Sequence, residues 1–142
     1  TRYRGRIATW DVVNEALDDG TITADVRLVV NTHLHFDHAG GNTWVDASGA
    51  VRPAFPRARY VVQRGEHHYA THTNERTSAS YFPHNWEPLL ASGQLEFLDG
   101  DGTVVPGISV VASPGHVPYH QSVLIDGGNG TVACFLGDVC PT

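Results

Sequence analysis

The chain has 142 residues, the size of one domain, and its 41% hydrophobic and 17% charged residues are typical of a globular protein. Its formal net charge of -6 argues against a nucleic-acid partner, and the absence of Lys excludes a P-loop, a Schiff base and a Ser-Lys dyad. Two Cys are too few for a disulfide framework, and no apolar run reaches the ~20 residues that span a bilayer, so no membrane partner is expected.

The first part of the chain is predicted to form a helix that leads into a buried strand. Apolar residues recur at helical spacing over residues 10–19, with Thr9 at the N-cap position and Gly20 at the C-terminal cap. Residues 26–32 contain a continuous apolar run at 28–30, which predicts a strand buried on both faces. The carboxyl end of such a strand is where sites form in open α/β sheets.

The rest of the chain is predicted to contain five strands, a loop and a helical insertion. Residues 42–56 include one Gly and two Pro and predict a long loop. Residues 64–93 read as a helical insertion or lid, with a short helix at 86–91 that Gly93 closes. The predicted strands span residues 59–63, 95–98, 108–112, 122–125 and 131–136.

Both ends of the chain suggest a piece of a longer protein. The sequence begins at Thr1, contains no Met and stops at Thr142, shortly after a predicted strand. We therefore expect residues 1–142 to form a single domain that is truncated at both ends. A missing leader sequence then carries no information, so localisation stays open, with the cytoplasm favoured.

The stretch after the first buried strand carries four ligand-type side chains. His33 and His35 are two residues apart, so an extended backbone projects them to the same side. Asp37 and His38 follow where the chain must turn, and the Gly40-Gly41 pair lets the main chain pass close to the same centre. Imidazole and carboxylate groups are ligands for Zn²⁺, Fe and Mn²⁺, so this stretch predicts a metal site rather than a polar loop.

Two later positions repeat this arrangement. His116 follows a predicted strand through a Pro-Gly turn, and Asp138 follows another predicted strand after Gly137. Taken alone, each would be an ordinary turn residue. Together with the first stretch, they place ligand-type side chains at the ends of three predicted strands.

These residues resemble the metallo-β-lactamase superfamily. Its pattern His-x-His-x-Asp-His, Gly-His and Gly-Asp occurs here in the same order, as His33-Leu34-His35-Phe36-Asp37-His38, Gly115-His116 and Gly137-Asp138. The resemblance covers about residues 10–142. It implies an α/β fold of the metallo-β-lactamase type, an αββα sandwich that this chain covers only in part.

The resemblance also implies a pair of divalent metal ions, zinc by default, with Fe or Mn as alternatives. The implied ligands are His33, His35 and His116 for the first ion, Asp37 and His38 for the second, and Asp138 as a bridge. In this family the second ion takes a further His from a later strand, which would lie beyond Thr142. We therefore expect the chain alone to hold one ion firmly.

The residues around His116 are similar to the branch of acyl-homoserine lactonases and methyl-parathion-hydrolase-like enzymes. That branch has Thr-Pro-Gly-His-Thr-Pro-Gly-His, and here Tyr119 replaces the second Gly. The last histidine of the phrase is His120. It either orients the site through a ring nitrogen or is a surface or packing residue.

The implied reaction is hydrolysis of a small molecule. Two cations that share a water lower its pKa from ~16 toward neutrality, and the hydroxide would attack a carbonyl or phosphoryl centre. Asp37 and Asp138 are the expected catalytic residues, placed to handle the proton. An ester or lactone is the expected substrate, and a glyoxalase-II-like thioesterase, a phosphotriesterase and a β-lactamase are the alternatives.

Other readings concern the chain as a whole and its remaining reactive residues. The chain would be a non-catalytic metal-binding fragment if truncation removes activity, and a second copy would form a homo-oligomer by covering exposed strands. The remaining expectations place His68 and His72 on a solvated helix face, Cys134 in the core, Cys140 in packing, and Tyr81, Phe82 and Trp86 in the core or, if the insertion is a lid, at an apolar entrance.

Overall fold

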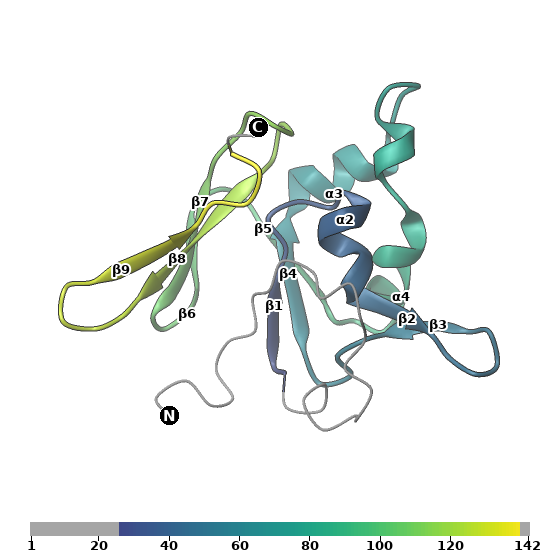
Figure 1. Ribbon diagram of the computed structural model, residues 1–142, viewed down its shortest axis with the longest axis horizontal. Helices are drawn as coiled ribbons and strands as arrows, with labels where there is room; N and C mark the ends of the chain where they lie inside the picture. Colours follow the sequence, from purple (N-terminus) through teal and green to yellow (C-terminus); the bar gives the residue numbers. More distant parts are fainter. Residues whose placement is uncertain (1–25, 140–142) are drawn as a thin grey trace.

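A parallel sheet lies at the centre of the computed structural model, which describes residues 26–139 (Figure 1). Its strands, in spatial order, are β1 (Leu28–Val30), β4 (Arg59–Gln63) and β5 (Leu95–Leu98). Both pairings are parallel, so the carboxyl ends of the three strands lie at the same edge of the sheet. The helix expected at residues 10–19 and Cys140 lie outside the described residues.

A second, antiparallel sheet packs against one face of the first (Figure 1). Its strands, in spatial order, are β6 (Gly102–Val105), β7 (Ile108–Ala112), β8 (Gln121–Asp126) and β9 (Val132–Phe135). Along β7, burial alternates as it does in a strand with one covered face. The core between the sheets is a cluster of buried aliphatic residues, namely Leu28, Val30, Val61, Ile108, Val110 and Val123.

Helices cover the other face of the first sheet (Figure 1). They are α2 (Phe36–Ala39), α3 (Arg64–Thr71) and α4 (Glu87–Ala91), with 3-10 turns η1 (Gly40–Asn42), η2 (Ser78–Ser80) and η3 (Pro83–Asn85). The core on this side is formed by Leu34, Ala39, Val62, Ala70, Tyr81 and Trp86. Residues 26–139 therefore form a helix layer and two sheets, which are three consecutive layers of the expected αββα sandwich. No helix in this range has the length and apolarity needed to cross a membrane.

All six predicted strands are present, and their ends differ from the prediction by at most two residues. Strands β4, β5 and β7 match their predictions, whereas β1 is two residues shorter at each end. Strand β8 is one residue longer at each end, and β9 is one residue shorter at each end. The prediction misses β6, because Gly102 opens this strand and Pro106-Gly107 follows it after only four residues.

The long loop predicted over residues 42–56 is wrong, because the stretch contains a hairpin. Strand β2 (Thr43–Val45) pairs antiparallel with β3 (Val51–Pro53). The turn is closed by Asp46, whose Oδ1 accepts backbone N–H groups from Ser48 at 2.8 Å and Ala50 at 3.0 Å. Local side-chain capping of this kind makes a short hairpin out of a stretch that looks like a loop.

The core prediction for Cys134 is also wrong. Cys134 lies in β9, where three of four residues are exposed. The strand is paired along one side only, with β8, among the described residues. Its apolar residues therefore lack the cover that an inner strand would have.

The segment 64–93 is structured, but only part of it is helical. Helix α3 ends at Thr71, and two 3-10 turns lead to α4. The core alternative holds for Tyr81 and Trp86, which are buried, whereas Phe82 is exposed.

Helix α4 ends in a Schellman motif centred on Gly93, as the sequence predicts. The N–H of Gly93 donates to Leu90 O at 3.1 Å, and the N–H of Gln94 donates to Leu89 O at 2.9 Å. Gly93 has a φ of 71°, which is left-handed backbone that favours glycine.

Replacement of Gly93 by Ala should therefore lower the free energy of unfolding by about 1–2 kcal/mol, because the Cβ strains this conformation. Gly102→Ala is the matched control, since neither position has an atom within 4 Å of the added Cβ and Gly102 lacks a positive φ, and it should change stability by less than about 0.5 kcal/mol. Urea denaturation of both variants measures the difference. Equal stability of Gly93→Ala and the wild type would contradict the prediction.

Candidate metal centre

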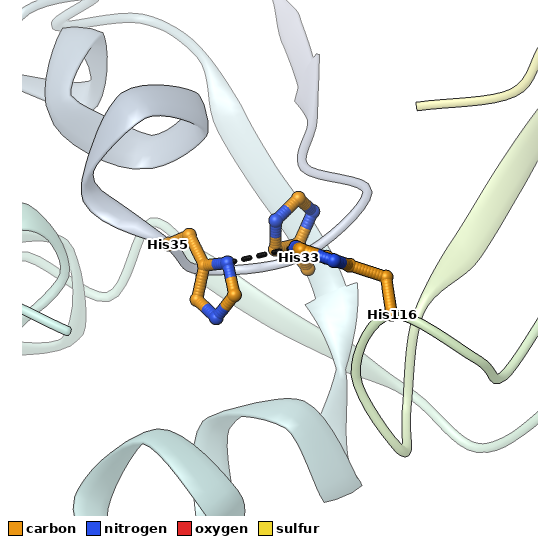
Figure 2. A group of neighbouring side chains, drawn as sticks. All are labelled: His33, His35 and His116. Atoms are coloured by element: carbon orange, nitrogen blue, oxygen red, sulfur yellow. Dashed lines mark hydrogen bonds between the residues drawn. The ribbon is translucent and has the colours of Figure 1, made fainter. Parts of the chain in front are cut away.

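Loops from both sheets bring the predicted ligands together. The loop that follows β1 carries His33 and His35, the loop between β7 and β8 carries His116, and Asp138 follows β9. Figure 2 shows the rings of the three histidines gathered around one point, although His116 is 81 residues from His35 in the chain. The fold therefore brings together ligand-type side chains that are far apart in the sequence.

Hydrogen bonds tie the loop after β1 to both sheets. The N–H of Asn31 donates to Val61 O at 3.0 Å, which continues the ladder of the first sheet. The buried side-chain amides of Asn31 and Asn42 bond to each other at 3.2 and 3.1 Å. From the second sheet, Gln121 donates its N–H to Thr32 O at 3.0 Å and its Nε2 to Asn31 O at 2.8 Å. The backbone that carries the first two histidines is thus held from three sides.

His33, His35 and His116 form the first donor group. One ligand atom from each lies within 4.8 Å of the others. His35 Nδ1 and His116 Nε2 are 3.0 Å apart. Two nitrogens bound to one tetrahedral zinc would be separated by about 3.3 Å, because each Zn–N bond is about 2.0–2.1 Å long. The observed separation is close to this requirement.

His33, His38 and Asp138 form the second donor group, with ligand atoms again within 4.8 Å of one another. Asp138 Oδ2 lies 3.3 Å from His38 Nε2 and 3.5 Å from His116 Nε2. One carboxylate oxygen is therefore next to a ring from each group, as a bridging ligand must be. His33 belongs to both groups, which the sequence pattern does not reveal.

The environment of His33 fits a cation ligand. The side chain is fully buried, and its Nδ1 pairs with Thr32 Oγ1 at 3.1 Å, whereas its Nε2 has no hydrogen-bond partner in the described part of the chain. Burial, reinforced by neighbouring His38 and His35, lowers the pKa of His33 to about 2, so the ring is neutral at ordinary pH. If Nδ1 donates its proton to Thr32, Nε2 carries a lone pair that has no hydrogen-bond donor among residues 26–139. A divalent cation would satisfy that lone pair.

Asp37 lies at the edge of the centre. It is in the first turn of α2, its side chain is 59% exposed, and its Oδ2 is 3.6 Å from His38 Nε2. It belongs to neither donor group. Of the six predicted ligands, Asp37 is the one that lies outside both donor groups, at the edge of the centre.

His120 is a buried residue that contacts the backbone of Asp138. Its Nε2 accepts the N–H of Asp138 at 3.2 Å, and its Nδ1 lies 2.8 Å from Ser113 Oγ. Because Nε2 accepts, the ring proton is on Nδ1 and is donated to Ser113. Because the side chain of His120 is buried, the alternative of a surface residue is excluded.

Gly137 lets the chain pass between His120 and Thr32 just before Asp138. Its φ is 58°, and an added Cβ would lie 2.8 Å from His120 Nε2 and 2.9 Å from Thr32 Cγ2. Only glycine fits there without a shift. The position of Asp138 is thus set by close contact with the loop that carries His33.

The sequence reading misses Glu66, a fully buried carboxylate beside the same loop. Its Oε1 accepts the N–H of Leu34 and the hydroxyl of Tyr81, each at 3.0 Å. The one available signal is a charged residue three positions after the buried strand β4, which alone is weak. His68 and His72 are exposed and lie outside both donor groups, in agreement with the solvated helix face.

Comparisons of the chain with known proteins identify a family and a set of relatives. The family model described as the metallo-beta-lactamase superfamily matches residues 16–139. An N-acyl homoserine lactonase from Bacillus sp is 35% identical over 115 residues, which are 81% of this chain and 39% of that protein. This chain therefore spans about two-fifths of the length of that curated relative.

Solved structures show the same similarity. A probable metal-dependent hydrolase from Staphylococcus aureus has 34% identity and a TM-score of 0.71, over 82% of this chain and 39% of that one. An N-acyl homoserine lactone hydrolase, solved with the product N-hexanoyl-L-homoserine at its catalytic metal centre, has 32% identity and a TM-score of 0.56, over 78% of this chain and 37% of that one. With its motifs in order and its three layers in place, this chain belongs to the metallo-β-lactamase superfamily.

Proposed function

We propose that the centre holds two divalent cations, zinc by default, and that the whole protein hydrolyses a small lactone or ester. The observation that carries the proposal is the place of Asp138 Oδ2, 3.3 Å from His38 Nε2 and 3.5 Å from His116 Nε2. When bound, the two cations would lower the pKa of a water that they share and polarise a substrate carbonyl oxygen.

Lone-pair chemistry supports the assignment of ligands. His33 Nε2 has a single lone pair, so it can bind one cation and cannot complete both donor groups at once. The proposed ligands are His33, His35 and His116 for the first cation, His38 and Asp37 for the second, and Asp138 as the bridge. The first cation then has three histidines, whereas the second depends on the exposed Asp37. The chain alone should hold the first more firmly.

Asp138 and Asp37 are the proposed catalytic residues. Asp138 Oδ2 lies between rings of both groups, where it would accept the proton of an attacking water. The side chain of Asp37 is 59% exposed, so it would pass a proton to solvent. These roles need no independent strong base, because the cations supply the acidity of the water.

The relatives and an aromatic surface beside the centre support the proposed substrate class. The relatives named N-acyl homoserine lactonases support a lactone with an acyl chain. Phe36, which follows His35, and Phe82 are exposed, and their rings stack with centroids 5.3 Å apart. We therefore propose that the segment 64–93 forms one side of an apolar entrance to the centre, as a lid would.

His33→Ala should abolish firm zinc binding by the chain, with affinity at least about 100-fold lower, because it removes one of the three histidines proposed for the first cation. The control is His72→Ala, which removes an exposed ring outside both groups and should bind zinc as the wild type does. Calorimetric titration of the metal-free chain measures stoichiometry and affinity. Two firmly held ions in the wild-type chain alone would contradict the assignment.

The metal-free chain should lose stability as the pH falls below 6.5. The folded state holds the pKa of His33 at about 2, whereas the unfolded state has its ordinary value of 6.5, so protonation favours unfolding between these values. This residue alone should lower the free energy of unfolding by about 2 kcal/mol from pH 7 to pH 5. Burial also lowers the pKa values of His35 and His120, which act in the same direction.

Urea denaturation in the presence of a chelator, at pH 7, 6 and 5, measures this loss. His33→Gln should show a shallower pH dependence than the wild type, because the replaced side chain does not titrate. Identical slopes for the two proteins would show that His33 is not the group that the acid titrates.

The whole protein should hydrolyse N-acyl homoserine lactones. Asp138→Asn should reduce kcat/KM by about 100-fold or more, because the amide cannot take up the proton. Cys134→Ser, at an exposed position on β9, is the control and should leave the rate unchanged. The assay includes a thioester and a phosphotriester. If the whole protein holds two cations yet hydrolyses none of these substrates, the proposed hydrolase activity is wrong and only the proposed metal binding remains.

A further inference from the structure

Glu66 is a buried carboxylate outside both donor groups. It lies in the first turn of α3 with a fully buried side chain, and its Oε1 accepts two hydrogen bonds of 3.0 Å, from Leu34 N–H and from the Tyr81 hydroxyl. Its Oε2 has no hydrogen-bond partner among the described residues. Burial raises the pKa of Glu66, and the two hydrogen bonds oppose that shift. Burial of a carboxylate costs more free energy than burial of an apolar side chain of similar size. This cost indicates that the hydrogen bonds accepted by Oε1 have a role beyond filling space.

The first donor that Glu66 binds is the backbone of the residue between two ligands. Leu34 lies between His33 and His35, past the last backbone bond of the first sheet, which Asn31 donates to Val61 O. The Leu34 N–H therefore finds its partner in a side chain instead of a neighbouring strand. The Leu34 side chain is also fully buried in the core under the helices. Both its backbone and its side chain are thus held from the helix layer.

The second donor leads to the ring of a ligand. Tyr81 is buried, and its hydroxyl donates to the same Oε1 of Glu66 that holds Leu34. Its ring packs against that of His35 with centroids 4.8 Å apart and planes at 64°. Glu66 therefore reaches His35 by two routes, through the backbone of Leu34 and through the ring of Tyr81.

We propose that Glu66 is a positioning residue that holds His33 and His35 in the geometry of the first cation site. This inference rests on the proposed function. Glu66 acts through Leu34 and Tyr81, and it is not itself a ligand. Outer partners of metal ligands commonly change metal affinity by 10- to 100-fold when they are removed, roughly the effect expected here.

Three variants separate positioning from general stability. Glu66→Ala removes the acceptor, Glu66→Gln keeps an acceptor oxygen at the same place, and Tyr81→Phe keeps the ring but removes the hydroxyl. The control is Leu89→Ala, which truncates a fully buried side chain in a different core cluster. Each chain is titrated with Co²⁺ against a competing chelator, and the visible absorption of bound Co²⁺ reports the coordination geometry. Circular dichroism establishes that each variant is folded.

Glu66→Ala should weaken Co²⁺ binding by about tenfold or more and change the absorption spectrum, whereas Glu66→Gln should stay within about threefold of the wild type. Tyr81→Phe should weaken binding by about threefold, because the bond to Leu34 remains. Leu89→Ala should lose stability but bind Co²⁺ as the wild type does.

Unchanged binding and spectrum in Glu66→Ala would overturn this inference alone, as would an equal loss in Leu89→Ala. If Glu66→Ala does not fold, Tyr81→Phe decides, and an unchanged spectrum and affinity in that variant overturn the inference. A wild-type chain that binds no Co²⁺ would overturn the proposed function and this inference together.

Discussion

The close approach of several imidazole rings where the loops of the two sheets meet is the constraint on which the rest of this structure depends. His35 Nδ1 and His116 Nε2 approach to 3.0 Å, a distance that two protonated rings would not tolerate. His33 is buried, and its Nε2 has no hydrogen-bond partner among the residues that the structure describes. A hydrogen bond joins the rings of His35 and His116 directly. The backbone that carries the rings fixes the rest of the arrangement.

The backbone is held by buried polar groups that come from every layer of the fold. The paired amides of Asn31 and Asn42 hold the loop after β1, and Gln121 ties it to the second sheet. Glu66 holds the same loop from the helix layer, and His120 holds the backbone of Asp138. Each of these groups is buried and hydrogen-bonded, which makes them costly to replace. The geometry of the centre therefore depends on contacts between the layers and not on one loop alone.

The sequence predicts the parts of this arrangement that depend on residue type and order. Continuous apolar runs predict the inner strands, and the spacing of His33 and His35 predicts two rings on one side. The hairpin of β2 and β3 escapes prediction, because it depends on how Asp46 caps its own turn. The sharing of His33 between donor groups and the burial of Glu66 escape it as well, since both follow from how distant segments meet. Contacts between segments that are distant in the chain leave no pattern in the local sequence.

The tight passage at Gly137 has a mechanical consequence. A methyl group would collide there with His120, which directly precedes β8 of the second sheet, and with Thr32 on the loop from the first, so the junction leaves no room for a side chain at this point. The backbone just before Asp138 is therefore confined between His120 and the residue that precedes His33. A change in the spacing of the two sheets would therefore move the backbone that carries the Asp138 carboxylate relative to the loop that carries His33.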